Sequence, residues 1–190
     1  MKVVVGVSNR HVHLTKEVYD KLFDKPLTKL RDLDQPGQFA ANECVSIRID
    51  DEVIDNVRIV GPLRDYCQVE ISRTDAYKLN VDPPIRMSGD LLGSLPVTLV
   101  GLKGEVFLEE GLIIASRHIH IKKSDLVKYG FSDNEVLAIK VCGEKGGILK
   151  NVHLKAGDNS SFKLHLDTDE ANAFGLKTGD AVEVVRIKEW

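Results

Sequence analysis

The sequence predicts a mainly β protein with short helices, made of two similar small β-barrel domains that arise from an internal repeat. Three observations predict this class. Short segments of alternating polarity are separated by frequent glycine and proline turns. Helical spacing of apolar residues is confined to a few short stretches. An Arg-His-x-His phrase occurs at residues 10–13 and again at 117–120, each time before a predicted helix.

The first half of the chain reads as short strands joined by two helices. Its expected strands cover residues 3–14, 44–49, 53–60 and 68–71. Its expected helices cover residues 17–23 and 74–79. Thr15 supplies a capping hydroxyl for the first helix, and Pro26 ends it because proline cannot continue a helix. Residues 27–39 are expected to be a connector with a turn at 35–37.

The rest of the chain shows the same alternation. Residues 85–111 are expected to be β structure with tight turns, because glycines separate their short apolar segments. The expected strands that follow cover residues 113–121, 136–141, 151–154, 162–166 and 181–187. The expected helices cover residues 126–128 and 168–175. Ser124 is the expected cap of the first of these helices, and Gly130 is its expected end.

The two halves can be aligned. The Arg-His-x-His phrases match, Asn56 matches Asn151, and in that same ungapped register Glu70 falls on His165. This repeat predicts a first barrel at 1–84, a connecting β segment at 85–112 and a second barrel at 113–190. It leaves open whether each barrel is built from one half of the chain or exchanges strands with the other.

The histidines of the repeated phrase point to metal sites. Residues two apart on a strand face the same side of a sheet, so each phrase presents two imidazoles together. The repeat adds a third donor to each pair, which gives the sets His11, His13 and Glu70, and His118, His120 and His165. Three protein donors with a fourth position open are typical of catalytic zinc. The alternative is that these are polar side chains on a solvated sheet face, and the matching repeat positions favour metal.

Residues near the expected donors suggest an anion-binding site. On an extended segment, Arg64 has the same parity as Glu70 and is expected to face the same cleft. The planar guanidinium group of arginine suits phosphate or carboxylate. Arg58, on an upstream strand, is a second candidate. The alternative interpretation of Arg64 is a surface arginine paired with Asp65.

Composition argues against several classes of partner. Hydrophobic residues make up 43% of the 190 residues and charged residues 29%, as in ordinary globular proteins. A net charge of −3 gives no basis for binding nucleic acid or an anionic membrane, and no apolar stretch reaches the length of a membrane-spanning helix. The three cysteines form no Cys-x-x-Cys pair, which predicts a reducing, cytoplasmic setting.

Six motifs cover nearly the whole chain, at residues 5–14, 61–64, 69–72, 87–90, 115–120 and 165–167. Together they resemble the motifs of the PduL-type phosphate propanoyltransferase (phosphotransacylase) family. The resemblance implies two zinc-bearing β-barrel domains with the active site at their interface. It also implies reversible transfer of a short acyl group, propanoyl or acetyl, between coenzyme A and inorganic phosphate.

The resemblance assigns roles to individual residues. It implies that His11, His13 and Glu70 hold one zinc ion, and that His118, His120 and His165 hold the other. It implies that Arg64 holds phosphate. The coenzyme A contacts that it implies are Ser8, Asn9, Arg58 and Asn172.

The N-terminus departs from part of this family. Members housed in bacterial microcompartments carry an N-terminal amphipathic extension, whereas Met1 and Lys2 alone precede the first expected strand here. This favours a free cytoplasmic enzyme and weakens the link to propanediol degradation, so acetyl and propanoyl remain alternatives as the acyl group.

Two other functions would use the same residues. A zinc hydrolase would activate water at the open position and release free acid from an acyl ester or thioester. A non-catalytic barrel would bind metal without turnover. The sequence leaves open the acyl chain length, the metal bound in the cell, the zinc that contacts the thioester, and whether the chain forms a homo-oligomer.

Overall fold

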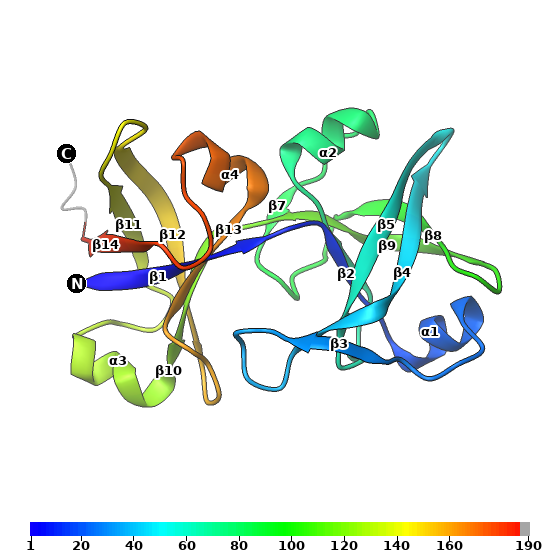
Figure 1. Cartoon of the computed structure of the whole chain (residues 1–190), viewed down its shortest axis with the longest axis horizontal. Coiled ribbons are helices and arrows are strands. Elements are labelled where there is room, and N and C mark those ends of the chain that lie inside the picture. Colours follow the sequence, from blue (N-terminus) through cyan, green and yellow to red (C-terminus); the bar gives the residue numbers. More distant parts are fainter. Residues whose placement is uncertain (187–190) are drawn as a thin grey trace. The chain divides into compact units, whose positions relative to one another are not determined.

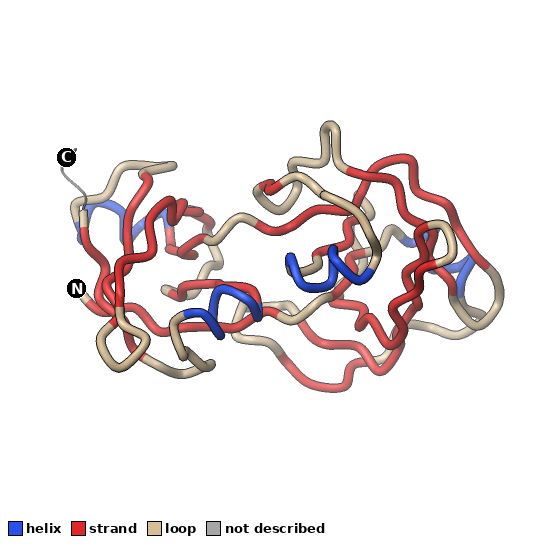
Figure 2. The backbone as a smooth tube through the Cα atoms, turned by 90° about the horizontal axis from the view of Figure 1, so that it is seen from above, coloured by secondary structure: helices blue, strands red, loops and turns tan. Residues whose placement is uncertain are grey.

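The computed structural model describes residues 1–186 and confirms a mainly β fold with short helices (Figures 1 and 2). The chain divides into two compact units. Among the described residues, unit 1 comprises Met1–Ser8, Asp34–Pro36 and residues 116–186. Unit 2 comprises Asn9–Leu33 and Gly37–Ala115. The boundaries expected from the repeat follow the order of the chain rather than contacts in space, and they stay a prediction.

Unit 2 contains a closed ring of six strands among its described residues. Their order is β4 (Phe39–Ile49), β5 (Glu52–Gly61), β2 (His11–His13), β6 (Gln68–Glu70), β9 (Glu105–Ala115) and β8 (Leu95–Val100), which returns to β4. Two further strands, β3 (Lys29–Asp32) and β7 (Ile85–Arg86), pair with β4 and β9. The helices of this unit are α1 (Lys16–Leu22) and α2 (Arg73–Lys78).

Unit 1 contains a matching ring of six strands in the described part of the chain. Their order is β11 (Val136–Val141), β12 (Gly147–Gly157), β10 (His118–Lys122), β13 (Lys163–Asp167), β1 (Lys2–Ser8) and β14 (Ala181–Val185), which returns to β11. The helices of this unit are α3 (Lys123–Tyr129) and α4 (Thr168–Ala173).

The two barrels have the same topology. At every step around the two rings, corresponding strands pair in the same sense, parallel or antiparallel. Asn56 on β5 and Asn151 on β12 also share a left-handed backbone, with φ values of 59° and 57°. Asparagine tolerates this conformation better than most residues, so the match lies in the backbone as well as in the sequence. The prediction of two similar small barrels is therefore confirmed.

The strand that precedes each Arg-His-x-His phrase pairs within the other barrel. β1 ends one residue before the first phrase but pairs with β13 and β14, as Figure 1 also shows. β9 ends one residue before the second phrase but pairs with β6 and β8. Residues 3–14 therefore form two strands in different units, with Asn9 and Arg10 between them.

Each barrel has its own apolar core, and the repeated phrase contributes to both. Val12 lies between the two histidines of β2, and Ile119 lies between those of β10; neither is exposed to solvent. Because side chains alternate along a strand, burying these two residues turns the flanking histidines to the opposite face. The burial pattern of the phrase thus sets the direction in which its imidazoles point.

Several local details differ from the expectation. Residues 29–32 form β3 inside the stretch expected to be a connector. α3 begins at Lys123 after Lys122, which makes no side-chain capping bond, so Ser124 is not its cap. The strand expected at 181–187 is described as far as Val185, and Ile187 lies outside the described residues. In residues 1–186 no helix is both long and apolar enough to span a membrane.

The placement of β1 in unit 1 can be tested with Val5→Ala. Val5 is fully buried on β1, so the variant should lose about 2 kcal/mol of stability in that barrel. In hydrogen exchange, amides of β13 and β14 should exchange faster, and those of β5 and β6 should not change. The matched variant Val12→Ala on β2 should show the reverse. Faster exchange of β5 and β6 in Val5→Ala would contradict the pairing.

Candidate metal centres and anion site

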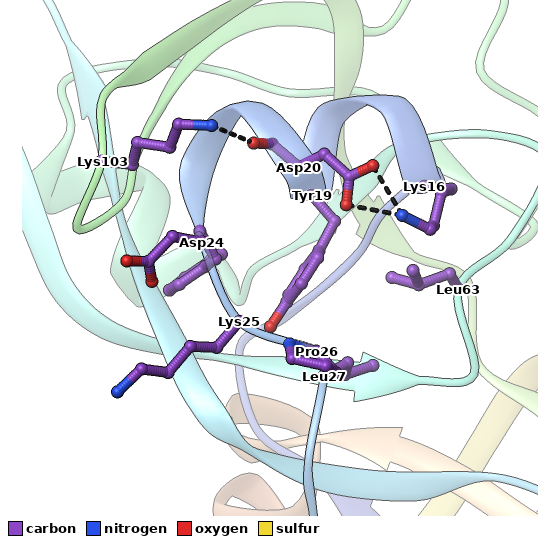
Figure 3. A pocket seen from close by; sticks show the side chains of 10 residues that line it. Lys16, Tyr19, Asp20, Asp24, Lys25, Pro26, Leu27, Leu63 and Lys103 are labelled. Atoms are coloured by element: carbon purple, nitrogen blue, oxygen red, sulfur yellow. Dashed lines mark hydrogen bonds and ion pairs between the residues drawn. The ribbon is translucent and has the colours of Figure 1, made fainter.

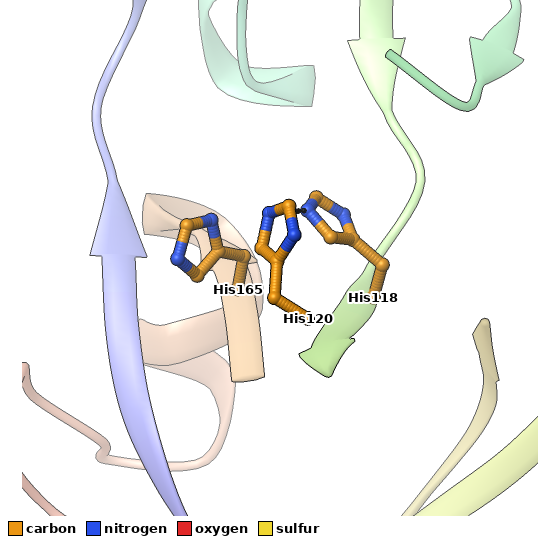
Figure 4. Close-up of side chains that lie close together, drawn as sticks. All are labelled: His118, His120 and His165. Carbon is orange, nitrogen blue, oxygen red and sulfur yellow. Dashed lines mark hydrogen bonds between the residues drawn. The ribbon is translucent and has the colours of Figure 1, made fainter. Parts of the chain in front are cut away.

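Each barrel gathers three potential metal donors on one face. In unit 1, His118 and His120 on β10 meet His165 on β13, and Figure 4 shows the three rings side by side. In unit 2, His11 and His13 on β2 meet Glu70 on β6. Within each set the donor atoms lie within 4.8 Å of one another. The structure thus brings together each of the two donor sets predicted from the sequence.

The antiparallel register explains how the third donor arrives. His11 lies directly opposite Glu70, and His118 lies directly opposite His165. Residues opposite each other on adjacent antiparallel strands point to the same face, with Cβ atoms about 5 Å apart. Gly6 on β1 lies beside His165, where an added Cβ would come within 3.3 Å of the imidazole ring. A glycine at this position therefore leaves room for the ring.

Backbone carbonyls orient the imidazole rings. The Nδ1 atom of His11 lies 2.8 Å from the carbonyl oxygen of Asn9, and the Nδ1 atom of His118 lies 2.8 Å from that of Ser116. When Nδ1–H donates to a carbonyl, Nε2 carries the lone pair that binds metal. The Nε2 atom of His11 lies 3.5 Å from Glu70 Oε2, and the Nε2 atoms of His118 and His120 are 3.1 Å apart. These donor sets fit a divalent cation such as zinc.

Electrostatics keep one of these rings in the form that binds metal. Burial, together with the nearby charges of His11 and Arg64, lowers the pKa of His13 to about 3. The imidazole is therefore neutral at physiological pH, and its Nδ1 lies 3.2 Å from the carbonyl oxygen of Val60. A neutral imidazole is the ligand form of histidine.

A buried amide that the sequence analysis left without a role holds Glu70. Gln68 is fully buried, and its Nε2 donates to Glu70 Oε1 at 2.5 Å and to Ser88 Oγ at 3.0 Å. The backbone N–H of Gly89 donates to Gln68 Oε1 at 2.8 Å. Gln68 thus connects the carboxylate to the loop at 87–90. The sequence signal for it was its position two residues before Glu70, on the same face of the strand.

Arg64 lies near the donor set of unit 2. Its charge is one of the influences that lower the pKa of His13, and its backbone N–H donates to the carbonyl oxygen of Leu14 at 2.8 Å. Its guanidinium group donates to the hydroxyl of Tyr66 at 2.8 Å and lies 5.6 Å from the centre of that ring. Tyr66 thus orients a cation beside the predicted metal donors.

The four residues implied as coenzyme A contacts are divided between the units. Ser8 and Asn172 belong to unit 1, and Asn9 and Arg58 belong to unit 2. Arg58 lies opposite His11 on the parallel strand β5 and donates to the carbonyl oxygen of Ala41 at 2.6 Å. Asn172 is exposed on α4. Their role as coenzyme A contacts stays a prediction.

Unit 2 also has a hollow of about 640 Å³ beside α1, which Figure 3 shows. Its lining includes Tyr19, Leu63 and three lysines. The Nζ of Lys16 binds the carboxylate of Asp20, at 2.6 Å and 2.7 Å from its two oxygens, and the Nζ of Lys103 donates to the backbone oxygen of the same residue at 3.0 Å. None of the predicted site residues lies among the described residues that line this hollow.

Replacing Gln68 with leucine tests how Glu70 is held. Leucine keeps most of the buried volume but removes the amide that bonds to Glu70. We expect zinc affinity to fall about 10- to 100-fold at the set in unit 2, because partners that orient metal ligands typically contribute this much. Competition with a chromophoric chelator measures the affinity, and the histidine set of unit 1 is the internal control. Unchanged zinc affinity at both sets would contradict this role.

Comparison with known proteins identifies the family. The family model for phosphate propanoyltransferase matches residues 4–177. A phosphate propanoyltransferase from Thermotoga maritima is 45% identical, over 97% of this chain and 90% of its own length. Relatives of the same name from Rhodobacter capsulatus and Lachnoclostridium phytofermentans are 43% and 45% identical, over 97% and 96% of this chain and 87% of their own lengths. The chain therefore belongs to the phosphate propanoyltransferase family, as its motifs predicted.

Proposed function

We propose that this protein is a phosphate acyltransferase, which reversibly transfers a short acyl group, propanoyl or acetyl, between coenzyme A and inorganic phosphate. Membership of the phosphate propanoyltransferase family supports the reaction class. The observation that carries the proposal is the meeting of a three-donor set with an oriented arginine in unit 2. This combination suits a reaction in which one reactant is a phosphate and the other a polarised thioester.

The proposal places one zinc ion at each donor set. His11, His13 and Glu70 would hold one, and His118, His120 and His165 would hold the other. A metal with three protein donors keeps a position for a substrate atom. Bound zinc supplies Lewis acidity, which suits a thioester oxygen or a departing thiolate.

Arg64 is the proposed phosphate-binding residue. Its guanidinium group presents a planar set of donors that matches phosphate oxygens, and Tyr66 orients it. A phosphate oxygen held there attacks the acyl carbon, the new C–O bond forms and the C–S bond breaks. The electron pair of that bond leaves with the coenzyme A sulfur, and the product is an acyl phosphate. The arginine contributes by orienting phosphate and holding its charge.

Recognition of coenzyme A is proposed to involve Ser8, Asn9, Arg58 and Asn172. The proposal also includes a reducing, cytoplasmic setting. In support of that setting, Cys44, Cys67 and Cys142 are all free thiols.

A phosphate-dependent assay separates transfer from hydrolysis. Acyl-coenzyme A is mixed with the protein, thiol release is followed with a disulfide reagent, and acyl phosphate is trapped with hydroxylamine. The proposal predicts that both products appear in equal amounts and that neither appears without phosphate. Thiol release without phosphate and without acyl phosphate would indicate a zinc hydrolase instead.

In the same assay, Arg64→Ala should lower kcat/KM for phosphate about 10- to 100-fold, because hydrogen bonds to a charged group contribute about 1.5–3 kcal/mol. Arg64→Lys should recover part of this loss, since it keeps the charge without the planar donor set. Arg48→Ala is the matched control, because Arg48 pairs with Glu105 on the outside of the same unit. Phosphate kinetics of Arg64→Ala equal to those of the control would remove Arg64 from the site.

A further inference from the structure

The arginine that begins each Arg-His-x-His phrase forms an ion pair that neither the sequence analysis nor the proposed reaction uses. In both barrels this arginine immediately precedes the first histidine of the donor set. In both it reaches a carboxylate on the short helix that follows the third donor. The recurrence of this arrangement suggests a role connected with the donor sets.

In unit 2 the pair is bidentate. Arg10 Nε donates to Asp75 Oδ2 at 2.9 Å, and Arg10 Nη2 donates to Asp75 Oδ1 at 2.7 Å. The side chain of Asp75 is only 2% exposed. Two parallel hydrogen bonds to a buried carboxylate fix the arginine geometry much more tightly than a surface ion pair does.

In unit 1 the corresponding pair joins Arg117 to Glu170. Arg117 Nε lies 2.7 Å from Glu170 Oε1. Glu170 Oε2 accepts the backbone N–H of Asp167 at 3.1 Å, so the same carboxylate caps the start of α4. Arg117 also donates to the backbone oxygen of Lys150 at 3.2 Å.

The two carboxylates occupy equivalent positions in the repeat. Asp75 follows Glu70 by five residues, and Glu170 follows His165 by five residues. Each lies three positions after the residue that caps its helix, Ser72 in α2 and Asp167 in α4. The ion pair is therefore part of the duplicated unit, although its acid differs between the barrels.

Each ion pair lies at the end of the ladder that joins the histidine strand to the strand of the third donor. The ladder between β2 and β6 has three register pairs, and so does the ladder between β10 and β13. Each ladder ends with the first histidine opposite the third donor, His11 opposite Glu70 and His118 opposite His165. β6 ends at that donor, whereas β13 continues to Asp167. The arginine precedes the first histidine by one residue and the acid follows the third donor by five, so each ion pair joins the two chain segments that leave the ladder at the donors. Each ion pair thus closes the ladder at the donors.

We infer that Arg10 with Asp75, and Arg117 with Glu170, are positioning pairs that hold the third metal donor of each barrel at its distance from the histidine pair. This inference rests on the proposed zinc sites and adds residues that do not touch the metal. Removing one member leaves the other charge without its partner and frees the end of a short ladder. The expected effect is a loss of zinc affinity of about 10- to 100-fold at that barrel alone.

The test measures zinc affinity at one site at a time. Full-length His118→Ala retains the intact set of unit 2, and full-length His11→Ala retains that of unit 1. Zinc-loaded proteins are titrated with a chromophoric chelator at pH 8, since burial raises the pKa of Glu170 to about 7. Asp75→Asn should weaken zinc binding at the unit 2 site and leave the unit 1 site unchanged. Glu170→Gln should do the opposite.

Two exposed ion pairs provide matched controls. Glu105→Gln removes the pair with Arg48 in unit 2, and Asp158→Asn removes the pair with Lys123 in unit 1; neither should change zinc affinity. If Asp75→Asn does not fold, Arg10→Lys keeps the charge, loses the planar fork and should weaken the same site. Wild-type affinity in the positioning variants, or equal loss at both sites, would overturn the inference. A wild-type chain that binds no zinc would instead overturn the zinc sites on which it rests.

Discussion

The candidate site depends on the register of two short antiparallel ladders. His11 must lie opposite Glu70, and His118 must lie opposite His165, for either donor set to form. A shift of one residue would turn every side chain of a strand to the other face. The same shift would therefore expose the core residues and bury the metal donors. Val12 and Ile119 lie buried in the barrel cores, and the histidines on either side of them therefore point away from those cores.

Other parts of the fold support these ladders. The carbonyl oxygens of Asn9 and Ser116 lie where the chain passes from one unit to the other. Each lies 2.8 Å from the Nδ1 atom of a histidine, His11 for Asn9 and His118 for Ser116. Gln68 fixes the carboxylate of Glu70 and ties it to the following loop. The backbone that exchanges strands between the barrels is therefore the same backbone that orients the first histidine of each set.

Much of this arrangement could be predicted from the sequence because it follows from periodicity. Alternation predicted the strands, and the ungapped repeat aligned Glu70 with His165 in the sequence. In the structure the two residues hold equivalent positions, each opposite the first histidine of its own barrel. The parallel neighbours repeat as well, because Arg58 lies opposite His11 and His153 lies opposite His118. The donor sets could therefore be predicted from chain positions alone, without knowledge of which barrel each strand joins.

Features set by tertiary contacts were harder to predict. All four residues of β3 are exposed and show no alternating burial, and residues 29–32 gave no strand signal in the sequence. α3 begins one residue before the expected capping serine. Gln68, Asp75 and Glu170 gain their roles from partners that lie close only after folding, although the five-residue spacing after the third donor was present in both halves.

The zinc content of the full-length chain, purified without exposure to chelator, tests the central claim most directly. Elemental analysis should find two zinc ions per chain, and one in each of the variants His11→Ala and His118→Ala. Less than one equivalent of zinc or a similar divalent metal in the wild-type chain would contradict the proposal of a metal site in each barrel.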